Sequence, residues 1–379
     1  MIQIEKFESG KYRQSINYKY FIPNLINTEW IWNDSKINRL IEDASFQLGQ
    51  LNSYATLVPN IDLFIHLHIT KEAVVSSKIE GTQTHFDEAF LQKENISNER
   101  KNDWQEVQNY TQALNHAIDA LKTLPLSSRL ILRTHEILMQ GVRGDTKSPG
   151  EYRRSQNWIG GKSLSDAVFI PPKHEHLIDF ISDLENFIHN DEVEIPLLLK
   201  AAIIHYQFET IHPFLDGNGR IGRLLITLFL IEKKVLNKPL LYLSSYFEKD
   251  KNLYYDNLTR VRSRNELLQW IKYFLTGITQ TSKKATETLS KILELKSNSE
   301  HLIQQDFGKR IKAGLILHDA LLKQPLLSIK EVQTICHLSA KSAGELVKLF
   351  EDKGLLKEYT GHSRNRIYSY EPYLNLFSD

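Results

Sequence analysis

The chain has 379 residues, which is more than one hydrophobic core usually fills, so its length predicts two or three domains. Hydrophobic residues make up 41% of the sequence and charged residues 25%, a balance that excludes an intrinsically disordered chain. The 47 Lys and Arg residues offset 46 Asp and Glu residues, and the resulting formal charge of +1 excludes a strong overall attraction to nucleic acid or to an anionic membrane. Any basic site must therefore be local.

The cysteine content and the hydropathy pattern indicate the cellular setting. A single cysteine, Cys336, excludes an intramolecular disulfide and a zinc site built from cysteines. The first residues mix Lys and Glu with apolar side chains and lack the apolar core of a secretory signal. The longest apolar stretch, Leu224 to Ile231, is under half of the about 20 residues that a membrane-spanning helix needs. We therefore expect a cytoplasmic protein with no membrane association.

Apolar residues at three- and four-residue intervals indicate that most of the chain is helical. The interval holds between Ile37 and Ala89 and is typical of helices with one buried face. It recurs in the segments 104–121, 128–138, 174–188 and 196–210. The predicted fold class is mainly α.

Residues 152–172 break the helical pattern. Two short runs, 156–159 and 167–170, have the composition of extended segments and flank Gly160-Gly161, which is a turn signal. We predict a small β-hairpin in this segment.

The C-terminal part of the chain has the order of a winged helix-turn-helix. A connecting helix is predicted over 283–299, and three further helices and a pair of strands follow it. The predicted helices are 310–322, 329–336 and 339–352, and the strands lie within 355–370 around Gly361-His362-Ser363. Residues 330–379 contain seven Lys or Arg and seven Asp or Glu, so no basic excess distinguishes DNA binding from protein binding for this module.

The segment 212–223, with the sequence HPFLDGNGRIGR, carries the chemistry. Pro213 and the run Gly217-Asn218-Gly219 disfavour a helix, and the apolar residues after Arg220 resume one. The glycines therefore lie where a loop enters a helix N-terminus. Free N–H groups and the positive end of the helix dipole make this place suitable for an anion.

The residue types around this helix N-terminus indicate a nucleotide phosphate. Gly217 and Gly219 have no Cβ, so a phosphate can approach the main chain closely. Arg220 and Arg223 lie on one face of the helix and carry guanidinium groups suited to phosphate oxygens. An acid beside such a site, Asp216, suggests a shared Mg²⁺ ion, which proteins commonly hold with one or two carboxylates and substrate phosphates.

His212 completes the set, because histidine is well suited to accept a hydroxyl proton near neutral pH. The alternative for each residue alone is structural: an ordinary turn, a surface helix or a core histidine. Structural roles for single residues do not explain why all of these residue types occur together at this spacing. Their combination predicts transfer of a phosphate-bearing group from a nucleotide to a hydroxyl, by positioning and charge stabilisation.

The motif HPFLDGNGRIGR resembles the Fic family motif at every constrained position. The resemblance implies that His212 is the base and Asp216 the Mg²⁺ ligand. It also implies a set of residues that bind the ATP phosphates: Gly217, Asn218, Gly219, Arg220, Gly222 and Arg223. The usual activity of the family is transfer of AMP from ATP to a Ser, Thr or Tyr hydroxyl of a protein, with release of pyrophosphate.

The sequence Ser76-Ser77-Lys78-Ile79-Glu80-Gly81 resembles the inhibitory motif of a Fic subclass. By that resemblance Glu80, with Ser76, pairs with Arg223 and keeps the γ-phosphate from its productive place. The physical basis is independent of the family, because a carboxylate and a phosphate compete for one guanidinium. The alternative is a capping box in which Ser77 and Glu80 begin a helix. We disfavour it, because the helical pattern runs up to Ile79 and Gly81 is a stop signal.

Two further segments resemble parts of the Fic family. Residues 152–172 are similar to the flap, whose edge aligns a target peptide by β-addition, and Val168 and Phe169 in it are expected to contact ATP. Tyr254 is expected to lie against the adenine base. The alternatives are an ordinary structural hairpin and core packing of Tyr254.

Together these inferences predict an autoinhibited protein AMP transferase with a Fic-type helical core, a β-hairpin flap and a C-terminal winged helix. The predicted domains are 1–100, an N-terminal helical region with the inhibitory helix; 101–282, the Fic core; and 283–379, the linker helix and winged helix. One alternative is removal of AMP, or transfer of another phosphate-bearing group, by the same pocket. Another is a DNA-binding regulator that senses nucleotide. The sequence leaves the formation of a homodimer open.

Overall fold

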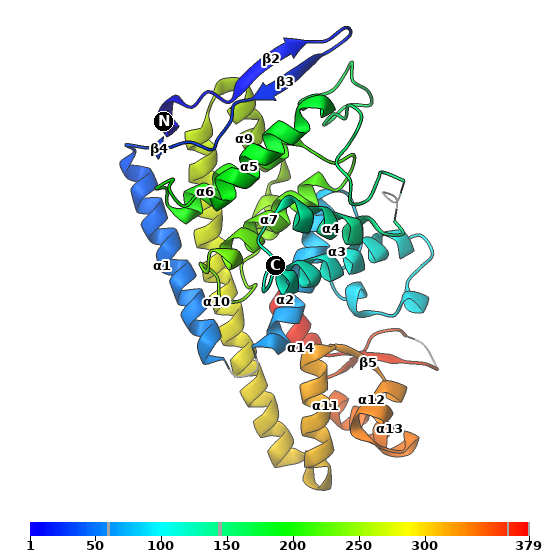
Figure 1. Cartoon of the computed structure of the whole chain (residues 1–379). Coiled ribbons are helices and arrows are strands. Elements are labelled where there is room, and N and C mark those ends of the chain that lie inside the picture. Colours follow the sequence, from blue (N-terminus) through cyan, green and yellow to red (C-terminus); the bar gives the residue numbers. More distant parts are fainter. Residues whose placement is uncertain (59–60, 143–145, 362–363, 378–379) are drawn as a thin grey trace.

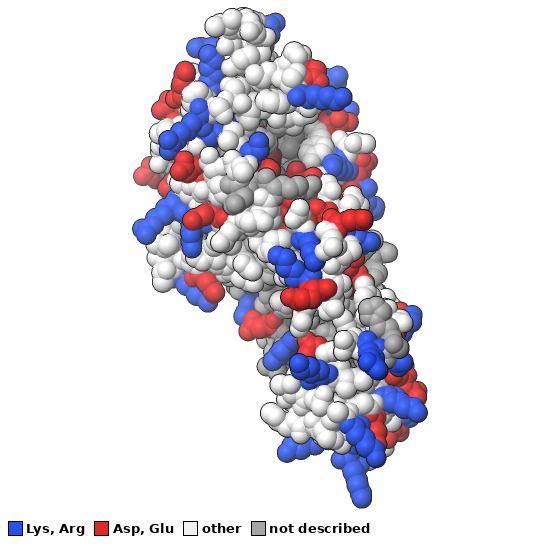
Figure 2. Space-filling view, turned by 90° about the vertical axis from the view of Figure 1, so that its right-hand side faces the viewer, with Lys and Arg blue, Asp and Glu red and all other residues white. Residues whose placement is uncertain are grey.

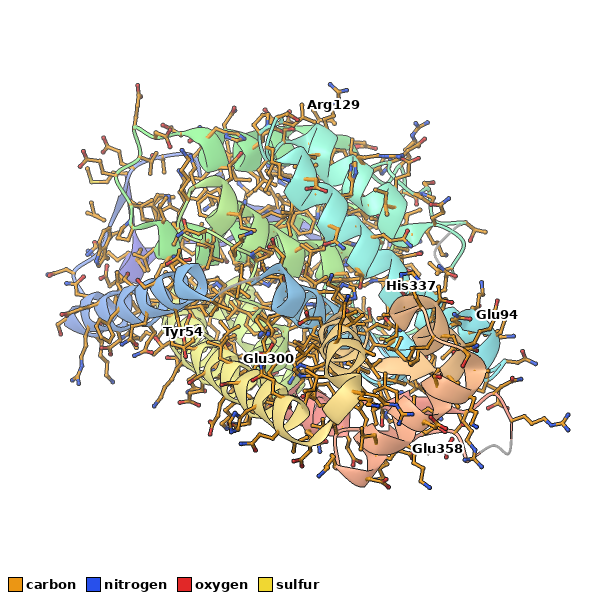
Figure 3. The ribbon with its side chains drawn as sticks, turned by 90° about the horizontal axis from the view of Figure 1, so that it is seen from below. Tyr54, Glu94, Arg129, Glu300, His337 and Glu358 are labelled. Carbon is orange, nitrogen blue, oxygen red and sulfur yellow. The ribbon has the colours of Figure 1, made fainter. Side chains whose placement is uncertain are left out.

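A computed structural model describes residues 1–58, 61–142, 146–361 and 364–377. The structure is mainly helical, as predicted, and α10 (Leu267–Asp306) runs along most of its length (Figure 1). The helix α1 (Ser35–Leu57) lies beside α10, as Figures 1 and 3 both show. Asp34 caps α1 by accepting from the N–H of Ile37 and joins the two helices through an ion pair with Lys272, with 2.6 Å between Nζ and Oδ2.

Two helices that are buried on nearly all sides form the centre of the protein. They are α6 (Leu197–Ile211) and α7 (Asn218–Glu232), and almost every side chain on them is buried. A helix that is apolar all round is stable only inside a core. The helices around or beside this pair are α2 (Asp62–Ile79), α3 (Lys101–Ala120), α4 (Ser128–Met139), α5 (Leu177–His189), α8 (Ser244–Lys249) and α9 (Lys251–Arg264). Short 3₁₀ helices are η1 (Ile4–Lys6), η2 (Glu88–Phe90), η3 (Lys93–Asn95), η4 (His174–His176), η5 (Gly308–Arg310) and η6 (Asn375–Phe377).

The N-terminus forms strands that the sequence analysis did not predict. β2 (Gly10–Gln14) and β3 (Lys19–Pro23) pair as an antiparallel hairpin, and β1 (Ile2–Gln3) pairs in parallel with β4 (Trp30–Ile31). The N–H of Phe21 on β3 donates to the carbonyl of Ile170 at 2.9 Å. The hairpin thus supports the end of the predicted flap.

The flap itself contains less β-structure than predicted. Its two runs meet at one antiparallel bridge between Ile159 and Phe169 rather than along two strands. The carboxylate of Asp166 accepts from the N–H groups of Lys162 and Ser163 and so organises the intervening residues as a loop. The prediction of extended runs over 156–159 and 167–170 is therefore wrong in length. Side-chain hydrogen bonds take the place of most backbone hydrogen bonds between the two runs.

In the described residues, the C-terminal module consists of four helices and a three-stranded sheet of order β5-β7-β6. Its elements are α11 (Ile311–Lys323), β5 (Leu326–Ser328), α12 (Ile329–Cys336), α13 (Ala340–Asp352), β6 (Lys357–Glu358), β7 (Ile367–Ser369) and α14 (Glu371–Leu374). The three predicted helices are confirmed to within one residue at each end. His362 and Ser363 of the predicted turn lie outside the described residues. The sequence analysis did not predict β5 and α14.

The helix α10 crosses the domain boundary that the sequence suggested. The predicted connecting helix 283–299 is confirmed as the middle of α10, which begins at Leu267. The division after residue 282 therefore falls within a continuous helix. Among the described residues, no helix combines the length and the apolar composition needed to cross a lipid bilayer.

Candidate active site

The loop between α6 and α7 holds the predicted catalytic residues. His212 ends α6 in the left-handed conformation, with φ of 51°, and its N–H donates to the carbonyl of Phe208 at 2.9 Å. The carbonyl of His212 accepts from Nε of Arg153 at 3.0 Å and from Nδ2 of Asn157 at 3.1 Å. Residues at the start of the flap therefore hold the loop in place.

The imidazole of His212 can accept a proton. Its side chain is 17% exposed, and Nδ1 has no hydrogen-bond partner among the described residues. Burial, reinforced by the positive charges of Arg262 and Arg153, lowers the pKa of His212 to about 3. The ring is therefore neutral at physiological pH in this conformation.

The side chain of Asn218 fixes the turn into α7. Its Oδ1 accepts from the N–H of Phe214, and its Nδ2 donates to the carbonyl of Phe214, both at 2.8 Å. Phe214 in turn stacks on the ring of His135, with 3.8 Å between centroids. Because Asn218 is the first residue of α7, its N–H and those of Gly219 and Arg220 have no acceptor within the helix. These N–H groups lie at the place where the sequence predicts an anion site.

Asp216 and Gly217 precede this helix N-terminus. Gly217 has φ of +78°, a conformation that favours glycine, and its N–H donates to Oδ1 of Asp216 at 2.6 Å. The side chain of Asp216 is 46% exposed. No group of three His, Cys, Asp or Glu residues that could hold a metal occurs in the part of the chain that the structure describes. Its Oδ1 also lies 3.6 Å from NH2 of Arg220. A single half-exposed carboxylate suits a cation that takes its other ligands from water and from substrate phosphates, which fits Mg²⁺.

The two arginines of the motif have different partners. NH1 of Arg220 lies 3.1 Å from Oε2 of Glu106, and both side chains are buried. NH2 of Arg223 lies 2.8 Å from Oε1 of Glu80. Arg223 also donates from Nε to Oγ of Ser76 at 2.8 Å and from NH2 to the carbonyl of Ser76 at 2.9 Å. The structure thus brings Ser76, Glu80 and Arg223 together, as the resemblance implied.

Glu80 lies at the end of α2 and not at the start of a helix. It follows the last helical residue, Ile79, and its N–H donates to the carbonyl of Ser77. Gly81 has φ of +107° and ends the helix. The capping-box alternative for Ser77 and Glu80 is therefore wrong.

Two glycines of the motif provide space for carboxylates. A Cβ on Gly219 would lie 2.3 Å from Oε1 of Glu80, and a Cβ on Gly222 would lie 2.1 Å from Oε1 of Glu209. Neither glycine has a positive φ, so space rather than backbone conformation requires them. The carboxylate of Glu80 lies over the first turn of α7, where the sequence analysis expected a phosphate.

Glu209 was not predicted from the sequence as a site residue. It lies between the motif arginines and His212. Its carboxyl is buried, and Oε2 is 3.9 Å from Nδ1 of His212. Burial raises the pKa of Glu209 to about 7, against the attraction of Arg223 and with a further rise from Glu80. The signal in the sequence is an acid on the largely buried helix α6, three residues before His212.

Of the remaining residues that were predicted to contact ATP, some lie in the core and some on the surface. Tyr254 is 1% exposed, its hydroxyl bonds with Nε2 of His205 at 2.9 Å, and its ring stacks on Phe247. The expected contact of Tyr254 with adenine is thus not compatible with this conformation, and the core-packing alternative is supported. The next residue, Tyr255, is partly exposed, and the negative charge of Glu80 adds to burial in raising its pKa.

Val168 and Phe169 also differ in exposure. Val168 is 68% exposed and is available to a ligand. Phe169 is buried against Phe21, and the guanidinium of Arg262 lies 4.2 Å from the centroid of its ring. The expected contact of Phe169 with ATP is therefore not supported, because its ring is already packed.

Comparisons with known proteins agree with this geometry. Residues 125–230 match the model of the Fic/DOC family, and residues 38–119 match the model of the Fic/DOC family N-terminal region. A Fic family protein from Desulfovibrio desulfuricans has a similar structure, with a TM-score of 0.57 and 20% sequence identity, over 89% of this chain and 96% of that one. The protein therefore has the Fic fold and contains a Fic domain.

Curated relatives share the region around the motif. A probable protein adenylyltransferase of Aquifex aeolicus is 38% identical over 112 residues, which are 30% of this chain and 32% of that protein. The protein adenylyltransferase Fic of Drosophila erecta is 31% identical over 112 residues, 29% of this chain and 21% of that protein. The matched region spans about a third of the length of the Aquifex protein and about a fifth of the length of the Drosophila protein.

Proposed function

We propose that this protein is an autoinhibited AMP transferase that moves AMP from ATP to a Ser, Thr or Tyr hydroxyl of a protein. The observation that carries the proposal is the arrangement of one loop. It places the neutral imidazole of His212, the half-exposed carboxylate of Asp216 and the free N–H groups of the α7 N-terminus together. The matching adenylyltransferases support ATP as the nucleotide.

His212 is the base in the proposed reaction. Its neutral imidazole takes the proton of the target hydroxyl, and the hydroxyl oxygen attacks the α-phosphorus of ATP. A new phosphoester bond forms, the bond to the β-phosphate breaks, and pyrophosphate leaves. The N–H groups at the start of α7 and the Arg223 guanidinium stabilise charge on the phosphates. Asp216 would hold Mg²⁺, which supplies further positive charge beside the phosphates.

Glu80 inhibits the transfer in this proposal by occupying the phosphate position. Its carboxylate bonds to Arg223 and fills the space over Gly219. A phosphate oxygen needs the same guanidinium and the same space. Movement of Glu80 would therefore be necessary before ATP can bind productively.

Two surfaces are assigned to partners. We propose that the flap 152–172, with exposed Val168, aligns the target peptide. We propose a winged-helix class for the C-terminal module, from its helices α11, α12 and α13 and its small sheet. Figure 2 shows Lys and Arg interspersed with Asp and Glu on the face that it draws. This distribution gives no preference for DNA over a protein partner.

The test compares the wild type with Glu80→Gly and with Glu80→Gly combined with His212→Ala. With Mg²⁺ and ATP labelled in the α-phosphate, we expect weak labelling by the wild type, strong labelling by Glu80→Gly and none by the double variant. Glu94→Gly, in η3, is a matched control that should behave like the wild type. Equal labelling by all variants would contradict the mechanism.

The same assay separates AMP transfer from its close alternatives. Parallel reactions with other labelled nucleoside triphosphates identify the transferred group. Addition of a target that already carries AMP measures its removal. If the wild type removes AMP faster than it adds AMP, the activity is removal of AMP and not the proposed transfer.

A further inference from the structure

The surroundings of His212 keep its ring neutral but also make it a weak base. Burial and the positive charges of Arg262 and Arg153 lower its pKa to about 3, and the main-chain carbonyl of Glu209 opposes this shift only in part. A general base works best when its pKa is near the pH of the reaction. The positive charge that the ring gains with the proton of the target therefore needs a compensating group nearby.

The carboxyl of Glu209 lies beside the buried edge of the imidazole. Oε2 of Glu209 is 3.9 Å from Nδ1 of His212, and the two side chains are 7% and 17% exposed. Nδ1 itself is buried, so a target hydroxyl reaches the ring at Nε2. The distance suits an ion pair with a protonated ring but is too long for a hydrogen bond. Such long spacings are common at catalytic groups before the substrate binds.

Packing alone does not explain a carboxyl at position 209. Oε1 of Glu209 is buried and has no hydrogen-bond partner among the described residues, which is unfavourable in a protein interior. Gly222 of the motif leaves room for this oxygen, because a Cβ there would lie 2.1 Å from it. The core thus accommodates a polar group that weakens it, and this group faces the proposed base.

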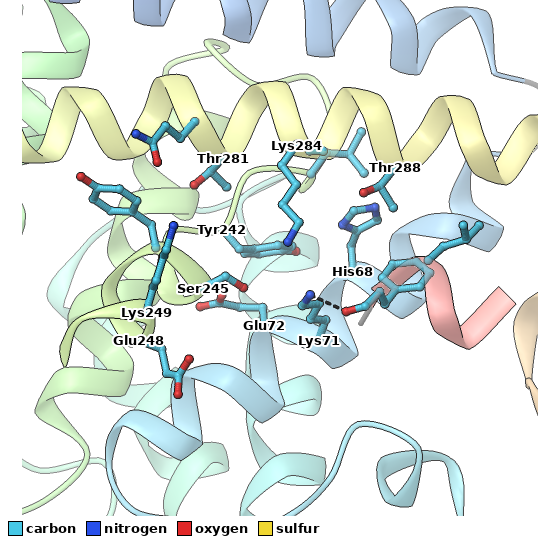
Figure 4. A pocket seen from close by; sticks show the side chains of 16 residues that line it. His68, Lys71, Glu72, Tyr242, Ser245, Glu248, Lys249, Thr281, Lys284 and Thr288 are labelled. Carbon is cyan, nitrogen blue, oxygen red and sulfur yellow. Dashed lines mark hydrogen bonds between the residues drawn. The ribbon is translucent and has the colours of Figure 1, made fainter. Parts of the chain in front are cut away.

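Glu72 shows by contrast how hydroxyl donors hold a buried acid. It belongs to α2 and lies in the wall of the cavity that Figure 4 draws. Burial raises its pKa to about 7, as it does for Glu209. Its Oε1 accepts from the hydroxyl of Tyr110 at 2.9 Å and from the hydroxyl of Ser244. Glu209 shares the burial and the raised pKa, but its carboxyl faces an imidazole.

We propose that Glu209 is a positioning residue for the base: its carboxylate holds the imidazole at Nδ1 and compensates the positive charge that His212 gains during transfer. This inference rests on the proposed AMP transfer. The target hydroxyl gives its proton to Nε2, while Nδ1 keeps its own proton and directs it toward Oε2. Glu209 forms no covalent bond. The proton leaves Nε2 for water after the new phosphoester bond has formed.

Glu209 can compensate this charge only when it is ionised. Burial raises its pKa to about 7, Arg223 lowers it and Glu80 raises it. Removal of Glu80 should therefore lower the pKa of Glu209 and leave more of the carboxylate ionised at neutral pH. The charged and titratable groups that act on Glu209 or on His212 are Arg223, Glu80, Arg262, Arg153, Tyr254 and Tyr255.

The test measures kcat and KM for ATP in the Glu80→Gly background, in which Arg223 is open to the nucleotide. With saturating ATP and Mg²⁺, kcat should rise with pH as Glu209 ionises and become constant above the pKa of Glu209. Glu209→Gln keeps the shape of the side chain and loses its charge. It should remove the rise and lower kcat at high pH by at least about tenfold. KM should stay within about twofold, because the lost interaction is made only in the transition state.

Glu72→Gln is the matched control, because Glu72 is equally buried and has the same raised pKa. It should keep the rise of kcat with pH. Thermal melting shows whether each variant folds. Glu209→Met, an apolar side chain of similar length, keeps the test valid if Glu209→Gln does not fold, and should also lose the rise. Glu209→Asp restores the charge and should recover the rise.

The outcomes separate this inference from the proposed function. If Glu80→Gly transfers AMP and the rise of kcat with pH persists in Glu209→Gln or Glu209→Met, the inference alone is overturned. Loss of the rise in Glu72→Gln as well would also overturn it. No AMP transfer by Glu80→Gly would contradict the proposed function itself, and this inference with it.

Discussion

The two arginines of the motif, three residues apart on α7, are held by two glutamates in different ways. In the pair of Arg220 with Glu106, the side chains are 4% and 6% exposed. In the pair of Arg223 with Glu80, the arginine is 1% exposed but the glutamate is 35% exposed. Each arginine also has one buried nitrogen without a partner among the described residues, Nε in Arg220 and NH1 in Arg223.

This difference distinguishes a structural pair from one that can open. Glu106 lies within α3, and removing it would leave the buried Arg220 with only the half-exposed carboxylate of Asp216, 3.6 Å from its NH2 atom, among the described residues. Glu80 follows the last residue of α2 and is 35% exposed, so it can reach solvent more readily than Glu106, but its departure leaves the guanidinium of Arg223 buried and bonded, within the described part of the chain, only to Ser76. The same motif therefore provides one arginine whose acid partner on α3 is buried and one whose acid partner is partly solvated.

Replacement of Glu106 is expected to have the largest effect on stability. Glu106→Ala should lower the free energy of unfolding by about 3–5 kcal/mol, because a buried guanidinium loses its partner. Glu80→Ala should lower it by less than Glu106→Ala does, since Glu80 is partly solvated and Arg223 keeps its two hydrogen bonds to Ser76. Urea unfolding of both variants measures the contrast. Similar losses would show that the two pairs are equivalent.

The pH dependence of stability should reveal Glu209, the acid next to Arg223. Its pKa is about 7 in the folded state, above its ordinary value of 4.5. The unfolded chain loses this proton first, so stability falls as pH rises from about 4.5 to about 7 and is constant above that range. Glu209→Gln should remove a fall of up to about 3 kcal/mol.

The measurement for Glu209 is urea unfolding of the wild type and of Glu209→Gln at pH 5 and pH 8. Glu72, whose pKa burial also raises to about 7, contributes equally to both proteins and cancels. An unchanged pH dependence in Glu209→Gln would contradict the assigned pKa.

The two glycines of α7 should respond differently to alanine. Gly222→Ala places a Cβ against the buried carboxyl of Glu209 and should cost about 1–3 kcal/mol of stability. Gly219→Ala meets the carboxylate of Glu80, which is free to move, and should cost less than about 1 kcal/mol. Thermal unfolding at one pH compares them. A larger loss for Gly219→Ala would show that Glu80 is fixed as firmly as Glu209.

The sequence predicted the chemistry of the motif but not the difference between its arginines. Helical spacing places Arg220 and Arg223 on one face, and this inference needs only the local sequence. Their partners are 114 and 143 residues away in the chain, on α3 and after α2. Glu80 was found through a motif, whereas Glu106 lies in an ordinary amphipathic helix and carries no local signal. Burial of each pair depends on how the helices pack, which periodicity does not determine.

The incorrect predictions also concern features that depend on how the helices and strands pack. Tyr254 and Tyr255 are adjacent aromatic residues, and only the packing of α9 against the core decides that Tyr254 is buried and Tyr255 partly exposed. The hairpin of β2 and β3 is short and is held by contacts such as that of Phe21 with Ile170. The C-terminal helices were predicted well because local signals define their ends, as in the capping box of Ser328 and Glu331.

A double-mutant cycle on Glu80 and Arg223 tests most directly that Glu80 acts through Arg223. The measured quantity is the initial rate of AMP transfer from ATP for the wild type, Glu80→Gly, Arg223→Lys and the double variant. We predict that Glu80→Gly raises the rate by at least about tenfold when Arg223 is present, and that it gives no gain when Arg223 is replaced by Lys. An equal gain in both backgrounds would contradict the account.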